Sequence, residues 1–421
     1  GCSLDSHGSM DTHMRIFHWG WTQLLMLLMA TLPWTGAAQA SDAAQVQGGG
    51  TKADRPRIAL VLSGGGAKGA AHIGVLKVLE EKRIPVDIVV GTSMGSYVAG
   101  MYAMGLSAEE VERMTLAIDW NKGYQDKVGR DELSLRKKQQ SEKYQLRTDI
   151  GVNGDAVQFP DGFFQGQSMA SLLRHATSNL PAQKSFDDLP IPYRAMATDM
   201  ETVTPFVLDH GSLAKAMQAS MSIPGALKPV EWEGHILADG GTVNNMPVDV
   251  AKAMGADVVI AVDIGAKLRT RESLKSGLAM IGQLTTYMTQ VGTEKQKALL
   301  GPKDVLLSPE FGDMGIADFA RMPEGIKQGE AVANRAAAQL DALSLSPDAY
   351  ADYRNKKLSR RAERSGQPAY YIDKVEILNK SRLSDETVRG MFKIRPDKVQ
   401  TYESLEAGIR RLYALESFDR I

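Results

Sequence analysis

From residue 57 onward, short continuous apolar runs alternate with amphipathic segments. The runs RIALVLS (57–63) and VDIVVG (86–91) are rich in Val, Ile and Leu, as expected of strands buried on both faces. Residues 70–82 and 96–104 place apolar side chains at helical spacing. Later apolar runs repeat this rhythm as IPYRAMATD, TPFVLD, HILADG, ADVVIAVDIG and KDVLLSPEF. The alternation predicts an α/β fold over residues 57–344, with three layers and a mostly parallel central sheet.

The first 56 residues do not follow this pattern. Residues 1–13 begin with Gly and contain HGSM and THM fragments, which predicts a cloning remnant. Residues 14–40 hold one Arg, the apolar run TQLLMLLMATLPW and a terminal Ala-Gln-Ala, which is typical of a secretory signal peptide. The run is too short for a spanning helix, and a buried amphipathic helix is the alternative. Residues 41–56 lack large apolar side chains apart from Val46 and predict a flexible linker.

The pattern changes again after residue 344. Residues 345–369 concentrate Lys and Arg with almost no apolar periodicity, which predicts a basic linker. This linker would be solvated or an exposed helix, with contact to a membrane surface as the alternative. In residues 370–421, YYIDKVEIL alternates as a strand, and TVRGMF and TYESLEAGIRRLYAL follow as amphipathic helices. These residues predict a second, small α+β module.

Composition excludes several classes of function. The 421 residues carry 49 Lys and Arg against 50 Asp and Glu, so the chain lacks the basic excess of a general nucleic-acid binder. Its single Cys, Cys2, rules out a disulfide scaffold and a cysteine-based zinc or iron–sulfur site. The sequence shows no cluster of metal ligands, so we expect chemistry that needs no metal or other cofactor.

The first glycine motif, SGGGAKG at residues 63–69, lies where the first strand meets the first helix. Gly64, Gly66 and Gly69 satisfy the pattern G-x-G-x-x-G, which alone is weak evidence for dinucleotide binding. A dinucleotide fold also requires an acidic residue at the carboxyl end of the second strand. The candidate, Asp87, opens that strand instead of ending it, which argues against a nucleotide-dependent oxidoreductase.

The second motif, Gly91-Thr92-Ser93-Met94-Gly95, follows the second strand directly, and a helix begins at once. This setting is typical of a nucleophile elbow, in which a sharp turn exposes the Ser93 hydroxyl. Gly91 and Gly95 keep side chains out of the way of that turn. The N–H of Met94 would then face a developing oxyanion.

The glycine-rich turn at Gly64, Gly65 and Gly66 acquires a matching role. Its backbone N–H groups have no side chains in front of them, so they can bind the oxyanion of a tetrahedral intermediate. Lys68 would add positive charge near a phosphate headgroup, with an exposed surface lysine as the alternative. One turn thus supplies a nucleophile and the other an anion hole.

The group that activates Ser93 is not a late histidine, because no His follows position 235. The histidines beyond the signal peptide lie in contexts that favour structural roles: His72, His175, His210 and His235. Asp239 ends an apolar strand and precedes two glycines, so its carboxylate would reach the same sheet edge as Ser93. A desolvated cleft raises the pKa of a carboxyl group, which makes it a better acceptor for a serine proton. A Ser–Asp pair is therefore chemically permissible.

Four blocks in this order, SGGGAKGAAHIGVL, GTSMGS, ASMSIPGALKPV and ADGGTVNNMP, resemble the patatin-like phospholipase family. The resemblance covers about residues 57–343. It implies a catalytic dyad, carried over to Ser93 and Asp239, and an oxyanion hole from the three glycines 64–66. It also implies a phospholipase A that cleaves fatty acyl esters of glycerophospholipids in a phospholipid membrane. The SIP sequence at residues 222–224 is expected to pack, not to react.

Residues 370–421 resemble a POTRA domain that stops before its last two strands. In secreted bacterial proteins, a patatin domain followed by POTRA precedes an outer-membrane β-barrel, as in patatin-like autotransporters. The resemblance implies such a C-terminal barrel in the full-length protein. It also implies export through the signal peptide, to the outside or to the outer membrane of a bacterium.

Some features leave alternatives open. A lipid-binding or toxin-like module with weak esterase activity is the alternative function. Met- and Ala-rich helical residues 281–300 would serve a homodimer contact. Four apolar residues that follow the elbow would either line an acyl groove or pack in the core: Val98, Met101, Tyr102 and Met104.

Overall fold

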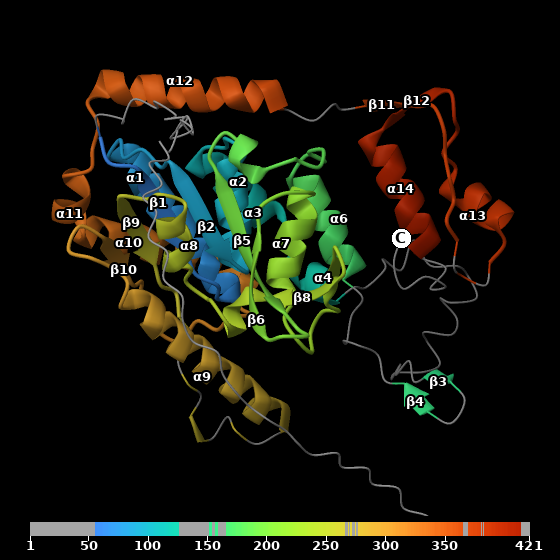
Figure 1. The fold of residues 1–421 in the computed structure, drawn as a ribbon, viewed down its shortest axis with the longest axis horizontal. Helices are drawn as coiled ribbons and strands as arrows, with labels where there is room; N and C mark the ends of the chain where they lie inside the picture. Colours follow the sequence, from blue (N-terminus) through green and yellow to red (C-terminus); the bar gives the residue numbers. More distant parts are fainter. Residues whose placement is uncertain are drawn as a thin grey trace, which may run out of the picture. The chain divides into compact units, whose positions relative to one another are not determined.

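The computed structural model describes residues 55–125, 151–153, 156–158, 166–265, 277–364, 369–379 and 383–413, with positions 268, 270, 271, 274 and 381. The predicted cloning remnant and signal peptide, and nearly all of the predicted linker at 41–56, lie outside the described residues. Figure 1 labels the helices and strands of the described part.

An eight-stranded sheet forms the centre of the fold (Figure 1). Its strand order is β10-β9-β1-β2-β5-β8-β7, and β6 pairs with β5. The strands from β10 to β5 in that order are parallel, whereas the pairs β5–β6, β5–β8 and β7–β8 are antiparallel. The prediction of a mostly parallel sheet is confirmed. The strands are β1 (Ile58–Leu62), β2 (Ile88–Thr92), β5 (Tyr193–Asp199), β6 (Thr204–Leu208), β7 (Val230–Trp232), β8 (His235–Asp239), β9 (Val258–Val262) and β10 (Val305–Leu307).

Helices cover both faces of the sheet, which confirms the three predicted layers. Successive side chains of β1 enter two separate cores, because a strand points alternate residues to opposite faces. Leu60 joins the larger core, and Val61 joins the smaller core against Val248 of α8 (Val248–Ala253). The helices of the larger core include α1 (Ala70–Glu81), α2 (Met94–Ala103), α3 (Ala108–Ala117), α6 (Gln167–Ala176), α7 (Leu213–Met221) and α10 (Met322–Arg335).

Shorter elements complete the α/β part of the chain. A hairpin of β3 (Gly151–Asn153) and β4 (Ala156–Gln158) forms its own two-stranded sheet. The remaining helices are α4 (Trp120–Gln125), α9 (Gly277–Lys297) and α11 (Ala337–Asp341). The short 3-10 turns are η1 (Gly66–Gly69), η2 (Phe186–Asp188), η3 (Gly240–Thr242) and η5 (Phe319–Arg321).

The register of the sheet places the two glycine motifs side by side. β1 and β2 are adjacent and parallel, and Leu62 at the end of β1 pairs with Gly91 of β2. The loops that follow these two strands therefore leave the sheet at the same edge. Ligand and active sites of open α/β sheets lie at this carboxyl edge.

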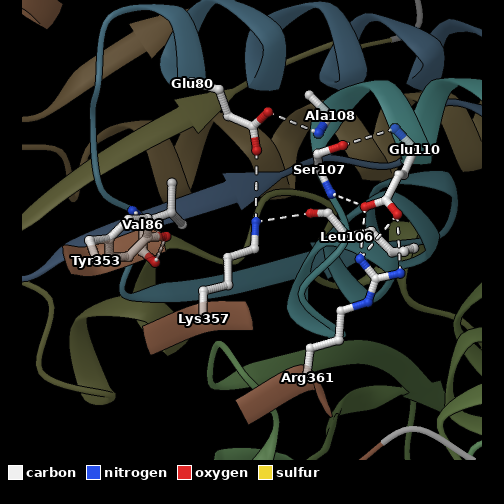
Figure 2. A network of polar contacts seen from close by, with 9 residues as sticks. All are labelled: Glu80, Val86, Leu106, Ser107, Ala108, Glu110, Tyr353, Lys357 and Arg361. Carbon is white, nitrogen blue, oxygen red and sulfur yellow. Dashed lines mark hydrogen bonds and ion pairs between the residues drawn. The ribbon is translucent and has the colours of Figure 1, made fainter. Parts of the chain in front are cut away.

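Most of the predicted basic linker forms the helix α12 (Pro347–Arg364), and one face of it is buried on the α/β domain. The Lys357 ammonium donates to the Leu106 carbonyl at 2.9 Å, and Arg361 pairs with Glu110 at 2.8 Å (Figure 2). Burial lowers the pKa of Lys357 to about 8. Because cationic head groups and their aliphatic stems make these contacts, they leave no apolar periodicity in the sequence. A solvated linker is therefore an incomplete description of this segment.

The last described residues form a small α+β arrangement. The predicted strand appears as β11 (Ala369–Ile372), and the two predicted helices appear as α13 (Asp385–Phe392) and α14 (Tyr402–Tyr413). A second strand, β12 (Lys398–Thr401), which the sequence analysis did not predict, pairs with β11 in antiparallel orientation.

Candidate active site

Ser93 forms the turn between β2 and α2, as the elbow motif predicts. Its backbone has φ 53° and ψ −126°, which is a strained combination for a residue with a side chain. A Cβ at Gly91 would lie 2.4 Å from the Gly95 carbonyl oxygen, and a Cβ at Gly95 would lie 2.2 Å from the Leu62 carbonyl oxygen. Both glycines are therefore required for α2 to begin so close to the ends of β1 and β2.

Asp239 ends β8 at the same level of the sheet as Ser93. Thr92 pairs with Met196 of β5. The next residue along β5, Ala197, pairs with Asp239. The Ser93 hydroxyl lies close enough to the Asp239 carboxylate there to lower the pKa of that carboxyl group. The structure thus brings together the two residues that the sequence analysis proposed as a pair.

The Asp239 carboxylate lies in a buried environment, with only 7% of the residue exposed. Burial raises its pKa from the ordinary 3.8 to about 6, while hydrogen bonds from Ser93 and from the Gly241 N–H (2.7 Å) oppose the rise. A carboxylate with this pKa is ionised at neutral pH and is more basic than an exposed aspartate. It is therefore better suited to accept a serine proton.

The glycine-rich turn lies directly over Ser93, because a Cβ at Gly64 would be 3.0 Å from the Ser93 Cβ. The sequence analysis assigned three oxyanion donors to this turn, and the structure corrects one of them. The Gly64 N–H donates to Asn245, at 3.3 Å from its carbonyl oxygen and 3.1 Å from its Oδ1. Within the described part of the chain, the N–H groups of Gly65 and Gly66 have no such acceptor. These two amides therefore remain as candidate oxyanion donors.

Two further features shape this anion site. Gly66 has φ 58°, and a Cβ there would lie 2.2 Å from the Ile316 carbonyl oxygen, so only glycine fits. The N–H of Met94 opens α2, where the first amides of a helix lack intrahelical acceptors and carry its positive dipole end. The predicted donor from Met94 is thus placed beside the nucleophile.

Two polar residues that the sequence analysis did not single out hold the backbone of the site. Asn245 also donates from Nδ2 to the Gly64 carbonyl at 3.3 Å, so it holds both polar groups of that residue. The Ser220 hydroxyl, on α7, accepts the N–H of Ser93 at 2.8 Å. Both residues are buried, and both belong to the sequence blocks quoted above for the resemblance. A buried polar side chain requires a partner, which is the signal that could have drawn attention to them.

The four histidines are placed elsewhere. The Nε2 of His72 lies 2.8 Å from the Ser63 carbonyl oxygen, and burial lowers the pKa of this imidazole to about 4. His210 and His235 contact acidic side chains, and His175 is exposed. None of these contacts involves the elbow serine or its aspartate partner.

The surroundings of the site settle two open alternatives. Lys68 is buried, with its ammonium 5.4 Å from the centre of the Phe311 ring, so the interpretation as an exposed lysine is wrong. Val98, Met101 and Tyr102 are fully buried in the larger core, and Met104 is partly buried against it, which favours packing over an acyl groove.

Over the residues that the structure describes, no cluster of three or more His, Cys, Asp or Glu could hold a metal ion. The same residues include no helix with the length and apolar character needed to span a bilayer.

Known proteins match the part of the chain that carries this site. Residues 60–252 match the family described as patatin-like phospholipase. Patatin-like phospholipase domain-containing protein 6 of Mus musculus is 37% identical over 215 residues, which are 51% of this chain and 14% of that protein. Neuropathy target esterase sws of Drosophila melanogaster is 32% identical over 212 residues, 50% of this chain and 13% of that protein. Lysophospholipase nte1 of Aspergillus fumigatus is 31% identical over 209 residues, 50% of this chain and 12% of that protein.

The chain therefore spans only a small part of the length of these relatives, and the match concerns one domain. The matched residues include the elbow, the glycine-rich turn and Asp239, which the fold brings to one edge of a three-layer α/β sheet. Residues 60–252 are thus similar, in sequence and in the placement of these residues, to a patatin-like phospholipase domain.

Proposed function

We propose that this chain is a secreted serine hydrolase, a phospholipase A that cleaves fatty acyl esters of glycerophospholipids. Ser93 is its nucleophile, and Asp239 is its general base. The observation that carries the proposal is the placement of the Ser93 hydroxyl beside the buried Asp239 carboxylate at one edge of the sheet, where burial raises the pKa of that carboxyl group to about 6. A hydroxyl with such a partner, at the N-terminal end of a helix, has the features of an activated nucleophile.

Acylation uses the dyad as follows. The Ser93 Oγ attacks the ester carbonyl carbon while its proton passes to the Asp239 carboxylate. The electron pair of the carbonyl bond moves onto its oxygen, and that oxyanion accepts hydrogen bonds from Gly65, Gly66 and Met94. When the tetrahedral intermediate collapses, the bond to the glycerol oxygen breaks. The protonated Asp239 then gives its proton to the leaving alcohol.

Deacylation repeats these steps with water. Asp239 takes a proton from a water molecule as the water oxygen attacks the carbonyl carbon of the acyl-enzyme. The second tetrahedral intermediate collapses by breaking the bond to Ser93 Oγ, which recovers the proton from Asp239. The fatty acid leaves. Every proton moves between the chain, the substrate and water, so the proposed reaction requires no metal ion or other cofactor.

The proposed substrate class has two supports. Residues 60–252 match a family described as patatin-like phospholipase, and two similar proteins are named an esterase and a lysophospholipase. The half-buried, uncharged amides of Gly65 and Gly66 suit the oxyanion of an ester. The alternative is a lipid-binding module with weak esterase activity. The experiment below distinguishes this module from a hydrolase.

The wider setting belongs to the same proposal. Residues 14–40 have the features of a signal peptide, which supports export from a bacterium. The resemblance of residues 370–421 to a POTRA domain supports a C-terminal outer-membrane barrel in the full-length protein. Exposed apolar side chains on α9, among them Leu284 and Tyr287, support a homodimer contact.

The experiment compares the wild-type protein with Ser93→Ala, Asp239→Asn and the control Ser185→Ala. Ser185 caps η2, which precedes β5 and so lies at the opposite end of the parallel strands from the site. Each protein is incubated with vesicles of phosphatidylcholine and phosphatidylethanolamine, and released fatty acids and lysophospholipids are measured by mass spectrometry. Labelling by a fluorophosphonate probe is measured in parallel.

We expect the wild type and Ser185→Ala to release fatty acids and to be labelled at Ser93. The Ser93 and Asp239 variants should lose about 10³-fold or more of the turnover and keep the circular dichroism spectrum of the wild type. Wild-type turnover by Ser93→Ala would overturn the proposal. Vesicle binding without release or labelling would identify a lipid-binding module instead.

A further inference from the structure

The last turn of α7 holds the backbones of both dyad residues. The Ser220 hydroxyl accepts the N–H of Ser93 at 2.8 Å. Two residues later, the Ser222 carbonyl accepts the N–H of Asp239, also at 2.8 Å. We infer that Ser220 is a positioning residue that holds Ser93 in the conformation from which it can attack. This inference rests on the proposed function and adds a residue to its machinery.

The strained backbone of Ser93 explains why such a partner is needed. With φ 53° and ψ −126°, the residue has left β2 and has not yet entered α2. Its N–H is therefore outside both the sheet ladder and the helix, and a buried N–H without an acceptor is costly. Ser220 is fully buried, and its hydroxyl is the acceptor for this N–H in the described structure.

The opposite side of the Ser93 residue is held by its own helix. The Ser93 carbonyl accepts the Ser96 hydroxyl at 2.7 Å and the Ser96 N–H at 2.8 Å. The peptide group that precedes Ser93 is therefore tied to α7, and the one that follows it is tied to α2. Between these two attachments the Cα–Cβ bond of Ser93 has one direction, which restricts its Oγ to the three staggered χ1 positions around that bond.

Both attachments come from one helix, α7. α7 packs against α2, β5 and β8, the elements that carry or separate the two dyad residues. Because the two acceptors belong to one turn of α7, they hold Ser93 and Asp239 at a fixed spacing. Loss of the first attachment would let the elbow relax while the Ser222 carbonyl still holds the N–H of Asp239. A misplacement of about 1 Å at a reacting atom reduces a rate by about 100-fold.

The test uses Ser220→Ala and Ser220→Cys, with Ser212→Ala as a matched control. Ser212 caps the other end of α7, where its hydroxyl accepts the Lys215 N–H. Its loss should destabilise the same helix without a direct effect on the dyad. The cysteine variant keeps a side chain of similar size with a weaker acceptor. We measure kcat and KM for p-nitrophenyl butyrate, the rate constant of fluorophosphonate labelling at Ser93, and Tm.

We expect Ser220→Ala to lower both kcat and the labelling rate constant by about 10- to 100-fold, with KM within about twofold of the wild type. Ser220→Cys should fall between the wild type and Ser220→Ala. Ser212→Ala should lower Tm and retain wild-type kcat. A purely structural role for Ser220 would lower Tm in both the Ser220 and Ser212 variants without this difference in kcat.

The failure of this inference differs from failure of the proposed function. If the wild type is labelled and active, and Ser220→Ala has the same kcat and labelling rate, Ser220 does not position Ser93 and the hydrolase proposal stands. If Ser220→Ala does not fold, a wild-type kcat in Ser220→Cys would overturn the inference, and an intermediate kcat would support it. If the wild type itself is neither labelled nor active, the proposed function fails and the inference fails with it.

Discussion

Replacing the proposed base by its amide, Asp239→Asn, is expected to stabilise the fold at neutral pH while it abolishes turnover. Burial raises the pKa of Asp239 from 3.8 to about 6. Because the folded-state pKa is the higher one, the folded protein holds this proton more tightly than the unfolded chain does. The contribution of Asp239 to the free energy of unfolding therefore falls as the pH rises from about 4 through about 6. Above that pH, the full penalty of the buried charge is present.

The size of the penalty follows from the pKa difference. A rise from 3.8 to about 6 corresponds to roughly 3 kcal/mol at pH 8. At pH 4.5 the folded carboxyl group is already protonated, whereas the unfolded one is mostly ionised. The same linkage then gives a penalty of about 1 kcal/mol in the free energy of unfolding. Asparagine removes the charge and retains both hydrogen bonds, since its Oδ1 can accept the Gly241 N–H and its Nδ2 can donate to Ser93. For a domain of about 300 residues, the expected gain in Tm is about 5 °C at pH 8 and about 2 °C at pH 4.5.

Thermal unfolding of the wild type and Asp239→Asn, followed by circular dichroism at both pH values, measures this gain. Asp304→Asn is the matched control. Although Asp304 is also partly buried, the Gly301 N–H and the Lys252 ammonium hold its pKa below the ordinary value. Its charge is therefore stabilising, and its amide should lower Tm by a similar amount at pH 8 and at pH 4.5, because both values lie above the ordinary pKa of 3.8. If Asp239→Asn gains no more at pH 8 than at pH 4.5, the carboxylate does not carry a desolvation penalty and the reasoning is refuted.

Two further predictions concern activity. The kcat/KM of the wild type for an uncharged ester should rise about tenfold per pH unit below pH 6 and level off above it, because Asp239 must be ionised to accept a proton; a flat profile from pH 4 to 8 would contradict this. Gly66→Ala should lower kcat by about 100-fold or more, because its Cβ would lie 2.2 Å from the Ile316 carbonyl oxygen and displace an oxyanion donor. Gly225→Ala, also at a positive φ but with nothing within 4 Å of its Cβ, should destabilise the fold by about 1 kcal/mol and keep wild-type kcat. Equal activities of these two variants would argue against the assigned role of the glycine-rich turn.

The parallel half of the sheet and the elbow could be predicted because their signals are local. β1 and β2 are buried along their whole length, so each appears in the sequence as an unbroken apolar run. The strained turn at Ser93 requires glycines on either side, and the sequence shows them at Gly91 and Gly95. Fold class and candidate nucleophile therefore follow from short stretches of sequence.

The position of Asp239 relative to Ser93 could not be predicted in the same way. β8 runs antiparallel to β5, and the pairing of Ala197 with Asp239 places the carboxylate level with Ser93. A register shift of one residue would turn that side chain to the other face of the sheet. The direction of the Gly64 N–H depends on Asn245, which is 181 positions away in the chain. Strand pairing and hydrogen bonds between residues far apart in the chain leave no pattern in the nearby sequence.

Ser220 shows why the groups that hold a site are harder to predict than the groups that react. A buried serine in a helix usually bonds to a carbonyl of its own preceding turn, as Ser222 does with Gln218. Ser220 lies two residues earlier in the same apolar stretch, yet its hydroxyl accepts the N–H of Ser93. Sequence context is nearly identical for the two serines, so only packing of α7 against the elbow separates their roles. Chemistry restricts a nucleophile to a few residue types in a special turn. A positioning group needs only one donor or acceptor, and any segment that packs nearby can supply it.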